Sequence, residues 1–201
     1  MPRTKAYDKE QVLEKAMNVF WNHGYGTTSV RLLEKEMGIN QFSIYSSFSN
    51  KKNLFIEALR KYREQVAQTR FRSLLEPGAR IGDLKDFLNG FVEAVRRGET
   101  GNGCLVVNTT SEMIGSTDPD VSVELQNYFA FVRGMMGDIL LNSLEAGDIP
   151  ADTDIEKCSN YLLGVMQGLS VIAKSMNEKQ VSDYISVAMR NLEPGFARMN
   201  N

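Results

Sequence analysis

The sequence contains few of the residues from which metal centres and catalytic triads are built. Among its 201 residues there is one histidine, His23, and there are two cysteines, Cys104 and Cys158. A single histidine argues against a histidine-rich metal site and a serine–histidine–aspartate triad. Two cysteines without a Cys-x-x-Cys spacing give no disulfide framework. His23 precedes a glycine at a predicted helix end, where we expect a capping role. No phosphate loop occurs either, so we expect no enzyme activity, no metal and no cofactor.

Long apolar runs are missing as well. No apolar stretch reaches the roughly 18 residues that a membrane-spanning helix needs, and residues 1–10 lack the apolar centre of a signal peptide. We therefore expect a cytoplasmic protein without a membrane partner. A hydrophobic content of 42% with 24% charged residues is typical of a folded globular chain.

The charge is unevenly distributed. Residues 1–65 hold 11 Lys and Arg against 7 Asp and Glu, whereas residues 66–201 hold 12 against 18. A basic first third on an acidic remainder indicates that the N-terminal end meets a polyanion.

Apolar residues recur at helical spacing nearly throughout, and strand-like alternation is scarce, so we expect an all-α protein of about nine helices. The predicted helices are 8–22, 29–37, 41–46, 50–70, 83–97, 104–114, 118–146, 154–175 and 178–192. Their predicted N-terminal caps include Asp8, Ser29, Asn40, Asn50, Asp118, Thr153 and Asn177. Glycines such as Gly24, Gly38 and Gly147 are expected to end helices.

The second and third predicted helices are separated by a tight turn at Gly38, which is a helix-turn-helix arrangement. Ile39 and Ile44 can hold the third helix against the second. The polar outer face of the third helix would then meet the major groove with Gln41, Phe42, Ser43, Tyr45 and Ser46. Glutamine can bond an adenine edge, serine suits several bases, and phenylalanine can pack on a thymine methyl group. Two helices around a glycine also occur in many helical proteins, so this pattern alone leaves a purely structural role open.

Four segments in one ordered series extend the pattern. They are Gly24-Tyr-Gly-Thr-Thr-Ser-Val-Arg31, Met37-Gly-Ile-Asn40, Ser43-Ile-Tyr-Ser-Ser-Phe48 and Asn50-Lys-Lys-Asn-Leu-Phe55. Over about residues 8–62 the series resembles the N-terminal DNA-binding domain of the tetracycline-repressor (TetR) family.

The resemblance implies a role for each matching position. Thr28, Ser29 and Lys51 match phosphate contacts, Tyr45 matches an aromatic residue that touches the DNA backbone, and Gln41, Phe42 and Ser43 match the base-reading positions. The full predicted DNA-binding set is Thr28, Ser29, Arg31, Asn40, Gln41, Phe42, Ser43, Tyr45, Ser46 and Lys51. Family members often carry a small residue in place of Phe42 and a histidine in place of Ser47, so the operator sequence does not transfer from relatives.

For the rest of the chain, the resemblance implies a helical domain that binds a small molecule and forms a dimer. We place the helix-turn-helix domain at residues 1–49 and the effector-binding and dimerisation domain at 50–201, with helix 50–70 connecting them. Aromatic and flexible apolar residues supply the ligand-binding candidates, although a place in the core is the more common role for any one of them. These candidates are Phe87, Phe91, Cys104, Val107, Tyr128, Phe131, Met135 and Met166.

The dimer is expected to form through helices 154–175 and 178–192. Gly164 and Gly168 lie four residues apart on one helix face and would let another helix come close. A neighbouring helix of the same chain would explain these glycines nearly as well.

Cys104 follows a glycine turn near a predicted helix N-terminus, which tends to lower the pKa of a thiol. The segment Gly103-Cys-Leu also resembles an element in the branch of the family that includes the electrophile-sensing N-ethylmaleimide repressor. The alternative is that Cys104 is a small core residue. We expect Cys158 to be a buried hydrophobic residue.

These observations predict a ligand-responsive transcriptional regulator, acting as a repressor. It would bind a palindromic double-stranded DNA operator as a homodimer, and an unknown small apolar effector would release it. The alternative is a helical small-molecule carrier or enzyme that does not bind DNA.

Overall fold

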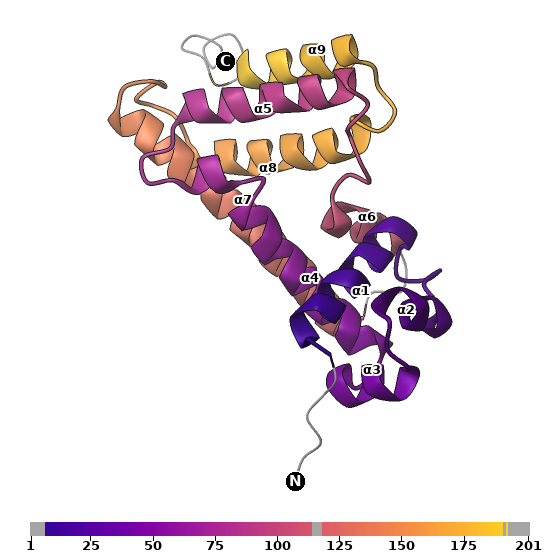
Figure 1. The fold of residues 1–201 in the computed structure, drawn as a ribbon. Coiled ribbons are helices and arrows are strands. Elements are labelled where there is room, and N and C mark those ends of the chain that lie inside the picture. Colours follow the sequence, from indigo (N-terminus) through magenta and orange to yellow (C-terminus); the bar gives the residue numbers. More distant parts are fainter. Residues whose placement is uncertain (1–6, 114–117, 191, 193–201) are drawn as a thin grey trace. The chain divides into compact units, whose positions relative to one another are not determined.

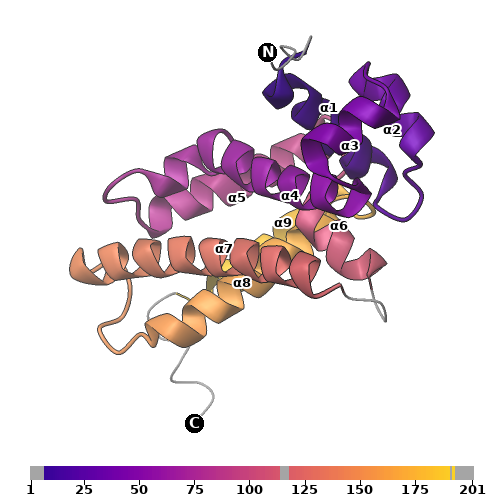
Figure 2. The same cartoon turned by 90° about the horizontal axis from the view of Figure 1, so that it is seen from below.

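The computed structural model describes residues 7–113, 118–190 and 192. These residues form nine α-helices and one short 3-10 turn, with no strand among them. The predicted all-α class is confirmed, and all nine predicted helices are present (Figures 1 and 2). Their bounds are α1 Lys9–His23, α2 Val30–Met37, α3 Gln41–Phe48, α4 Lys51–Gln68, η1 Arg72–Leu75, α5 Ile81–Arg96, α6 Leu105–Glu112, α7 Pro119–Glu145, α8 Ile155–Ile172 and α9 Glu178–Arg190. Two residues inside the predicted spans, Ile114 and Asn191, lie outside the described residues.

Local capping interactions explain where several of these helices begin. Ser29 accepts a hydrogen bond from the backbone N–H of Leu32 at 3.1 Å. At the last helix, the side chains of Asn177 and Gln180 each accept a bond from the other's backbone N–H, at 3.0 and 3.1 Å. This reciprocal pair is the predicted capping box, which satisfies two N–H groups that the helix itself leaves unpaired.

The start of α8 differs from the prediction. Asp154, not Thr153, is the cap, and its carboxylate accepts from the backbone N–H of Lys157 at 3.1 Å. Thr153 instead donates its hydroxyl to the carbonyl of Pro150. Two adjacent residues with capping side chains made this choice ambiguous from sequence, because both types favour the position.

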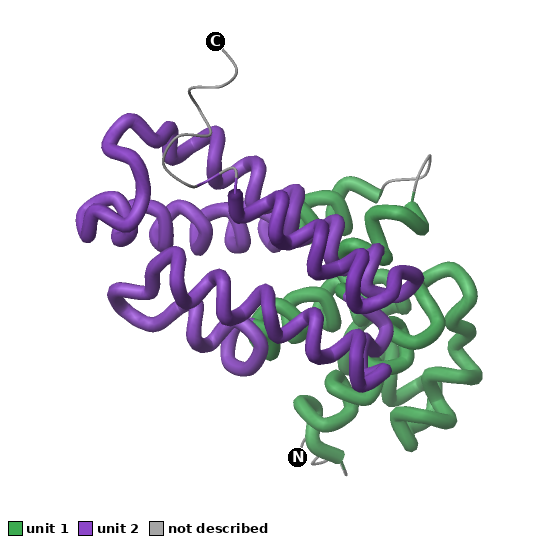
Figure 3. The backbone as a smooth tube through the Cα atoms, turned by 90° about the horizontal axis from the view of Figure 1, so that it is seen from above, with its two compact units in different colours: residues 1–66, 104–126 green, residues 67–103, 127–201 purple. Residues whose placement is uncertain are grey.

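The chain divides into two compact units (Figure 3). Unit 1 comprises residues 1–66 and 104–126, and unit 2 comprises residues 67–103 and 127–201. Unit 1 therefore joins α1–α3 and most of α4 to α6 and the first turns of α7, which come from much later in the sequence. The boundary that we place at residues 49 and 50 is drawn by function and stays a prediction.

The core of unit 1 forms between α1 and α4. Both helices bury apolar residues at helical spacing. These are Val12, Leu13, Ala16, Met17, Val19 and Phe20 in α1, and Leu54, Phe55, Ala58, Leu59, Tyr62 and Val66 in α4. Phe20 packs edge-on against Phe55 with ring centroids 4.9 Å apart, and Trp21 packs against Tyr62 at 5.2 Å. These aromatic pairs anchor the base on which α2 and α3 rest.

In unit 2, α5, α8 and α9 lie side by side (Figure 1). An ion pair of 2.5 Å joins Arg96 near the end of α5 to Glu178 at the start of α9. The buried hydroxyl of Ser143 on α7 accepts from the backbone N–H of Ile81, which starts α5. None of the helices in the described ranges combines the length and the apolar character needed to cross a membrane.

Candidate DNA-binding surface and effector cavity

The turn between α2 and α3 has the geometry that its sequence predicts. Gly38 adopts a left-handed conformation with φ of 74°, and its N–H bonds to the carbonyl of Glu34 at 3.0 Å. This conformation is strained for residues with a Cβ. Asn40 then caps α3, accepting from Ser43 N–H at 2.8 Å, while Ile44 is fully buried. The inner face of α3 is thus packed against α2.

The outer face of α3 leaves several predicted base-reading groups in solvent. Gln41, Phe42 and Ser46 are exposed, and Ser43 and Tyr45 are half-buried. Phe42 has 83% of its surface exposed, which gives the molecule an aromatic ring in water without a packing role in the described chain. An outward ring on the first turn of this helix is well placed to bury its surface against a nucleic acid base.

Not every predicted phosphate contact is equally available. Thr28 is only 1% exposed, and its hydroxyl donates to the carbonyl of Gly24 at 2.5 Å. A phosphate contact through this hydroxyl would require that bond to break. Ser29 is exposed although it caps α2, and Arg31 is exposed on the same helix.

Lys51 lies at the start of α4, where its Nζ stands 4.4 Å from the ring centroid of Tyr25. Burial lowers the pKa of Lys51, and the nearby carboxylate of Glu112 opposes this effect. The ammonium group therefore lies against the Tyr25 ring, near the Glu112 carboxylate.

Two residues near this surface were missed by sequence reasoning. The Tyr7 hydroxyl lies 2.6 Å from Ser47 Oγ and donates to the carbonyl of Ser43 at 3.1 Å, so the segment before α1 touches α3. Glu112 at the end of α6 reaches the connector between α1 and α2. An aromatic residue next to the Asp8 cap was a weak signal for Tyr7, whereas no local pattern pointed to Glu112.

The first turns of α7 are tied to α4 by ion pairs within unit 1. Lys52 pairs with Asp118 at 3.1 Å and with Asp120 at 2.8 Å. These hydrogen bonds raise the pKa of Lys52 and lower that of the Asp118 carboxyl. Arg60 binds the buried carboxylate of Glu124 at 2.5 Å.

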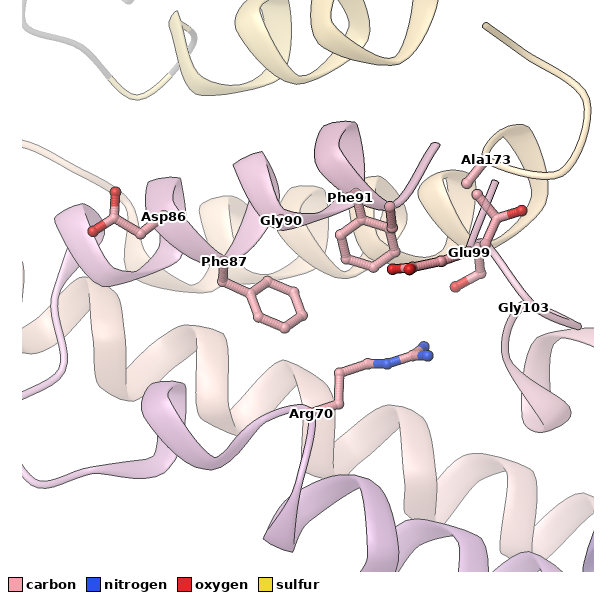
Figure 4. Close-up of a pocket in the computed structure, with 11 residues that line it drawn as sticks. Arg70, Asp86, Phe87, Gly90, Phe91, Glu99, Gly103 and Ala173 are labelled. Atoms are coloured by element: carbon pink, nitrogen blue, oxygen red, sulfur yellow. The ribbon is translucent and has the colours of Figure 1, made fainter. Parts of the chain in front are cut away.

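Unit 2 contains a cavity of about 320 Å³ beside α5. Its apolar wall includes Phe87 and Phe91, whose rings meet edge-on at 5.5 Å (Figure 4). Gly90 lies between them on the same wall and leaves room because no side chain fills that position. The cavity explains why Phe87 and Phe91 are only half-buried, although both are large apolar residues.

The polar groups of the cavity are few. Arg70 extends its guanidinium group into the space, and Glu99 points its carboxylate toward it from the opposite side (Figure 4). Glu99 is neutralised by Arg97 at 3.0 Å, whereas Arg70 makes no ion pair within the described part of the chain. Asp86 lies at the far end with its carboxylate directed away from the phenyl rings (Figure 4).

Of the eight predicted ligand-binding residues, Phe87 and Phe91 line this cavity. Tyr128, Met135 and Met166 are buried side chains of unit 2, and Phe131 is half-buried against Phe71 with centroids 6.3 Å apart. Cys104 and Val107 belong to unit 1 and are buried there. Apolar spacing identified the inward faces but could not distinguish a cavity wall from a filled core. Arg70, Glu99 and Ser170 of the lining were not predicted.

The two thiols differ in exposure. Cys104 is 3% exposed, so the partial exposure that a sensor needs is not present in this conformation. Cys158 is half-buried, not fully buried as we expected, and burial raises the pKa of its thiol. Within the described ranges, no group of three His, Cys, Asp or Glu side chains is placed to hold a metal ion.

The two glycines of α8 lie in different surroundings. A Cβ at Gly168 would lie 2.5 Å from the Tyr184 hydroxyl on α9, so a helix of the same chain accounts for this glycine. A Cβ at Gly164 would meet no atom of the described residues within 4 Å, and Gly164 is exposed. Tyr161 and Val171 are exposed large residues three before and seven after Gly164 on the same face.

Two family models match the chain. Residues 12–58 match "Bacterial regulatory proteins, tetR family", and residues 81–189 match "Tetracyclin repressor-like, C-terminal domain". Among curated proteins, the uncharacterized HTH-type transcriptional regulator YezE of Bacillus subtilis is 30% identical over 199 residues, covering 96% of this chain and 100% of that protein. The HTH-type transcriptional repressor ComR of Escherichia coli is 27% identical, covering 86% of this chain and 82% of ComR.

Solved structures agree with these matches. A cysteine variant of the TetR family transcriptional regulator CifR, in complex with 26-bp double-strand operator DNA, has a TM-score of 0.77. It is 28% identical, and the alignment covers 94% of this chain and 99% of that chain. The reduced form of Escherichia coli NemR has a TM-score of 0.79 at 16% identity and covers 91% of this chain and 95% of that one, which supports the fold alone.

Proposed function

Because this chain belongs to the tetracycline-repressor family and is a ligand-responsive, DNA-binding transcriptional regulator, we propose that it is a homodimeric repressor of a two-fold symmetric operator. The observation that carries the proposal is the exposed first turn of α3. It presents Gln41 and Phe42 to solvent on a helix whose inner face is buried through Ile44.

In the proposed complex, α3 enters the major groove. Gln41 bonds an adenine edge, Phe42 packs on a thymine methyl group, and Ser43 and Ser46 adapt to neighbouring bases. Phosphates are bound by Arg31, Tyr45, Lys51 and the N-terminus of α2 at Ser29, and Asn40 lies at the start of α3 beside the same groove. These contacts fix the position of the protein without reading sequence.

We propose that the dimer forms through the outer faces of α8 and α9. Gly164 supports this because none of the described residues fills the space beside it, while Tyr161 and Val171 offer exposed apolar surface on the same face. Two-fold symmetry would place the two α3 helices about 34–36 Å apart, one turn of DNA.

We propose the cavity beside α5 as the effector site. Phe87 and Phe91 suit a small, largely apolar molecule with a flat ring, and Arg70 can hold a polar or acidic group at one end of it. Such an effector lowers operator affinity only to the extent that it binds the DNA-free conformation better than the DNA-bound one.

The test is selection of random double-stranded DNA by the purified chain, followed by sequencing. A palindromic motif bound with a steep loss of affinity at higher salt supports the proposal. A helical carrier would use the same cavity but select no DNA, so recovery of unenriched sequence would refute the regulator. A reporter gene behind the selected motif then separates repression from activation.

A further inference from the structure

A carboxylate from a distant part of the sequence binds the backbone of residues 24–29, the connector between α1 and α2. Glu112, the last residue of α6, accepts a hydrogen bond from Tyr25 N–H at 2.9 Å through Oε2. Its other oxygen, Oε1, accepts from Gly26 N–H at 2.5 Å. Both bonds lie inside unit 1. Successive backbone N–H groups that converge on an anion form charge-assisted bonds, which are shorter and stronger than neutral ones.

The carboxylate also explains the glycines on both sides of Tyr25. A Cβ at Gly24 would lie 2.8 Å from Glu112 Oε2, and a Cβ at Gly26 would lie 3.0 Å from Oε1. Gly24 has a positive φ of 78° besides, but Gly26 does not. For Gly26, the backbone conformation would admit alanine, and the close approach of Glu112 is what stands against it.

Glu112 is linked to two groups that we assign to DNA phosphate, the N-terminus of α2 and the ammonium group of Lys51. The connector that it holds runs directly into Thr28 and Ser29, where α2 begins. Its charge also acts on Lys51, opposing the burial that lowers the pKa of that lysine. Lys51 Nζ in turn stands over the ring of Tyr25, the residue whose N–H bonds to Glu112.

We infer that Glu112 is a positioning residue for operator binding. It does not touch DNA. It fixes the connector so that the N-terminus of α2 and the ammonium group of Lys51 are already in place when phosphate arrives. The inference rests on the proposed function, and it goes further by giving the DNA-binding head a residue that lies outside residues 12–58, the part that matches the N-terminal family model.

The direction in which Glu112→Gln changes operator affinity distinguishes this role from a general charge effect. Glu112→Gln replaces a negative charge near Lys51 with a neutral amide. This change of charge alone should tighten binding to a polyanion. The positioning role predicts the reverse. The amide retains one oxygen acceptor, but its NH₂ faces a backbone N–H, so we expect operator affinity to fall about tenfold.

The experiment compares wild type with Glu112→Gln, using the DNA motif that wild type selects, and measures affinity across a salt series. Glu64→Gln is the control, because Glu64 is exposed on α4 in the same unit and its loss changes the charge equally. Hydrogen exchange on the DNA-free protein reads the Tyr25 and Gly26 amides directly. In Glu112→Gln, at least one of these two amides should lose protection, because only one acceptor oxygen remains, while the Leu33 amide in α2 keeps its protection.

A second variant keeps the inference testable if Glu112→Gln folds poorly. Gly26→Ala should weaken binding by pushing the carboxylate away, and adding Glu112→Ala should cost little more, because the two changes break the same contact. If Glu112→Gln binds as tightly as wild type, or if the two amides keep their protection, the positioning role is wrong while the proposed function stands. If wild type itself selects no DNA, the proposed function fails, and the positioning role fails with it.

Discussion

Phe42 is expected to read a thymine methyl group, and the contact can be removed from either side. Phe42→Ala removes the ring, and replacing a thymine by deoxyuridine removes only the methyl group. Because the ring is 83% exposed in the free protein, its truncation should leave the free energy of unfolding within about 0.5 kcal/mol of wild type. Any larger loss of DNA affinity then belongs to the interface.

The expected magnitude follows from the area of one methyl group. Burying a group of this size is worth about 0.8 kcal/mol. A dimer that meets two half-sites would lose about 1.6 kcal/mol, or roughly 15-fold in Kd, when both thymines are replaced. In Phe42→Ala, the same replacement should have almost no effect, because the methyl group no longer has a partner.

The assay is a titration of labelled operator at fixed salt, with deoxyuridine placed symmetrically at each thymine of the selected motif in turn. The coupling between the two changes is the quantity that matters. If no position shows a deoxyuridine penalty in wild type, or if the penalty persists undiminished in Phe42→Ala, then Phe42 does not read a thymine methyl group.

Four further predictions concern other parts of the molecule. Lys51→Ala should weaken binding to all DNA sequences alike and reduce the slope of log affinity against log salt concentration by about one. Gln41→Ala should instead relax the preference for particular base pairs by about 1–3 kcal/mol. If Gln41→Ala selects the same motif as wild type, the base-reading assignment of Gln41 is wrong. Gly164→Leu should disrupt the homodimer without disturbing the subunit, because the space beside it is open, and light scattering at micromolar concentration that still finds a full dimer would remove this face from the interface. In the folded protein, an alkylating agent should modify the half-buried Cys158 faster than the buried Cys104, since access limits thiol reaction; mass spectrometry that finds Cys104 modified first, with loss of operator binding, would instead identify it as a sensor.

The helices and most of their caps could be predicted because the signals are local. Asn177 and Gln180 stand three residues apart, which is the spacing of a capping box, and the structure contains both bonds. The buried faces of α1 and α4 follow from 3.6-residue periodicity in the same way. The helix-turn-helix was found because four short motifs fall in register within residues 24–55.

What the sequence could not predict depends on contacts between distant segments. Periodicity places Phe87 and Phe91 on the inner side of α5 but does not tell whether side chains fill the space in front of them. Arg70 faces that space from the turn that follows α4, and no spacing rule relates Arg70 to Phe87 and Phe91. Glu112 and Gly26 are 86 residues apart, so their bond becomes visible only when α6 is placed beside the connector. Thr28 looked free to bind phosphate because a sequence does not show that its hydroxyl bonds to Gly24.

The bond between Glu112 and the connector has a consequence for the construction of chimeric regulators. An exchange of DNA-binding heads between relatives would naturally be cut between the two matched segments, residues 12–58 and 81–189. Such a cut separates the Gly24-Tyr25-Gly26 connector from the carboxylate that closes it. A DNA-binding domain joined to a C-terminal domain without an acidic side chain at this position would leave two backbone N–H groups without their acceptor. Conversely, where residue 26 is not glycine, its Cβ would lie 3.0 Å from Glu112 Oε1, which is closer than ordinary van der Waals contact. A C-terminal domain that is to receive this DNA-binding domain should therefore be chosen first by the residue at the end of its α6.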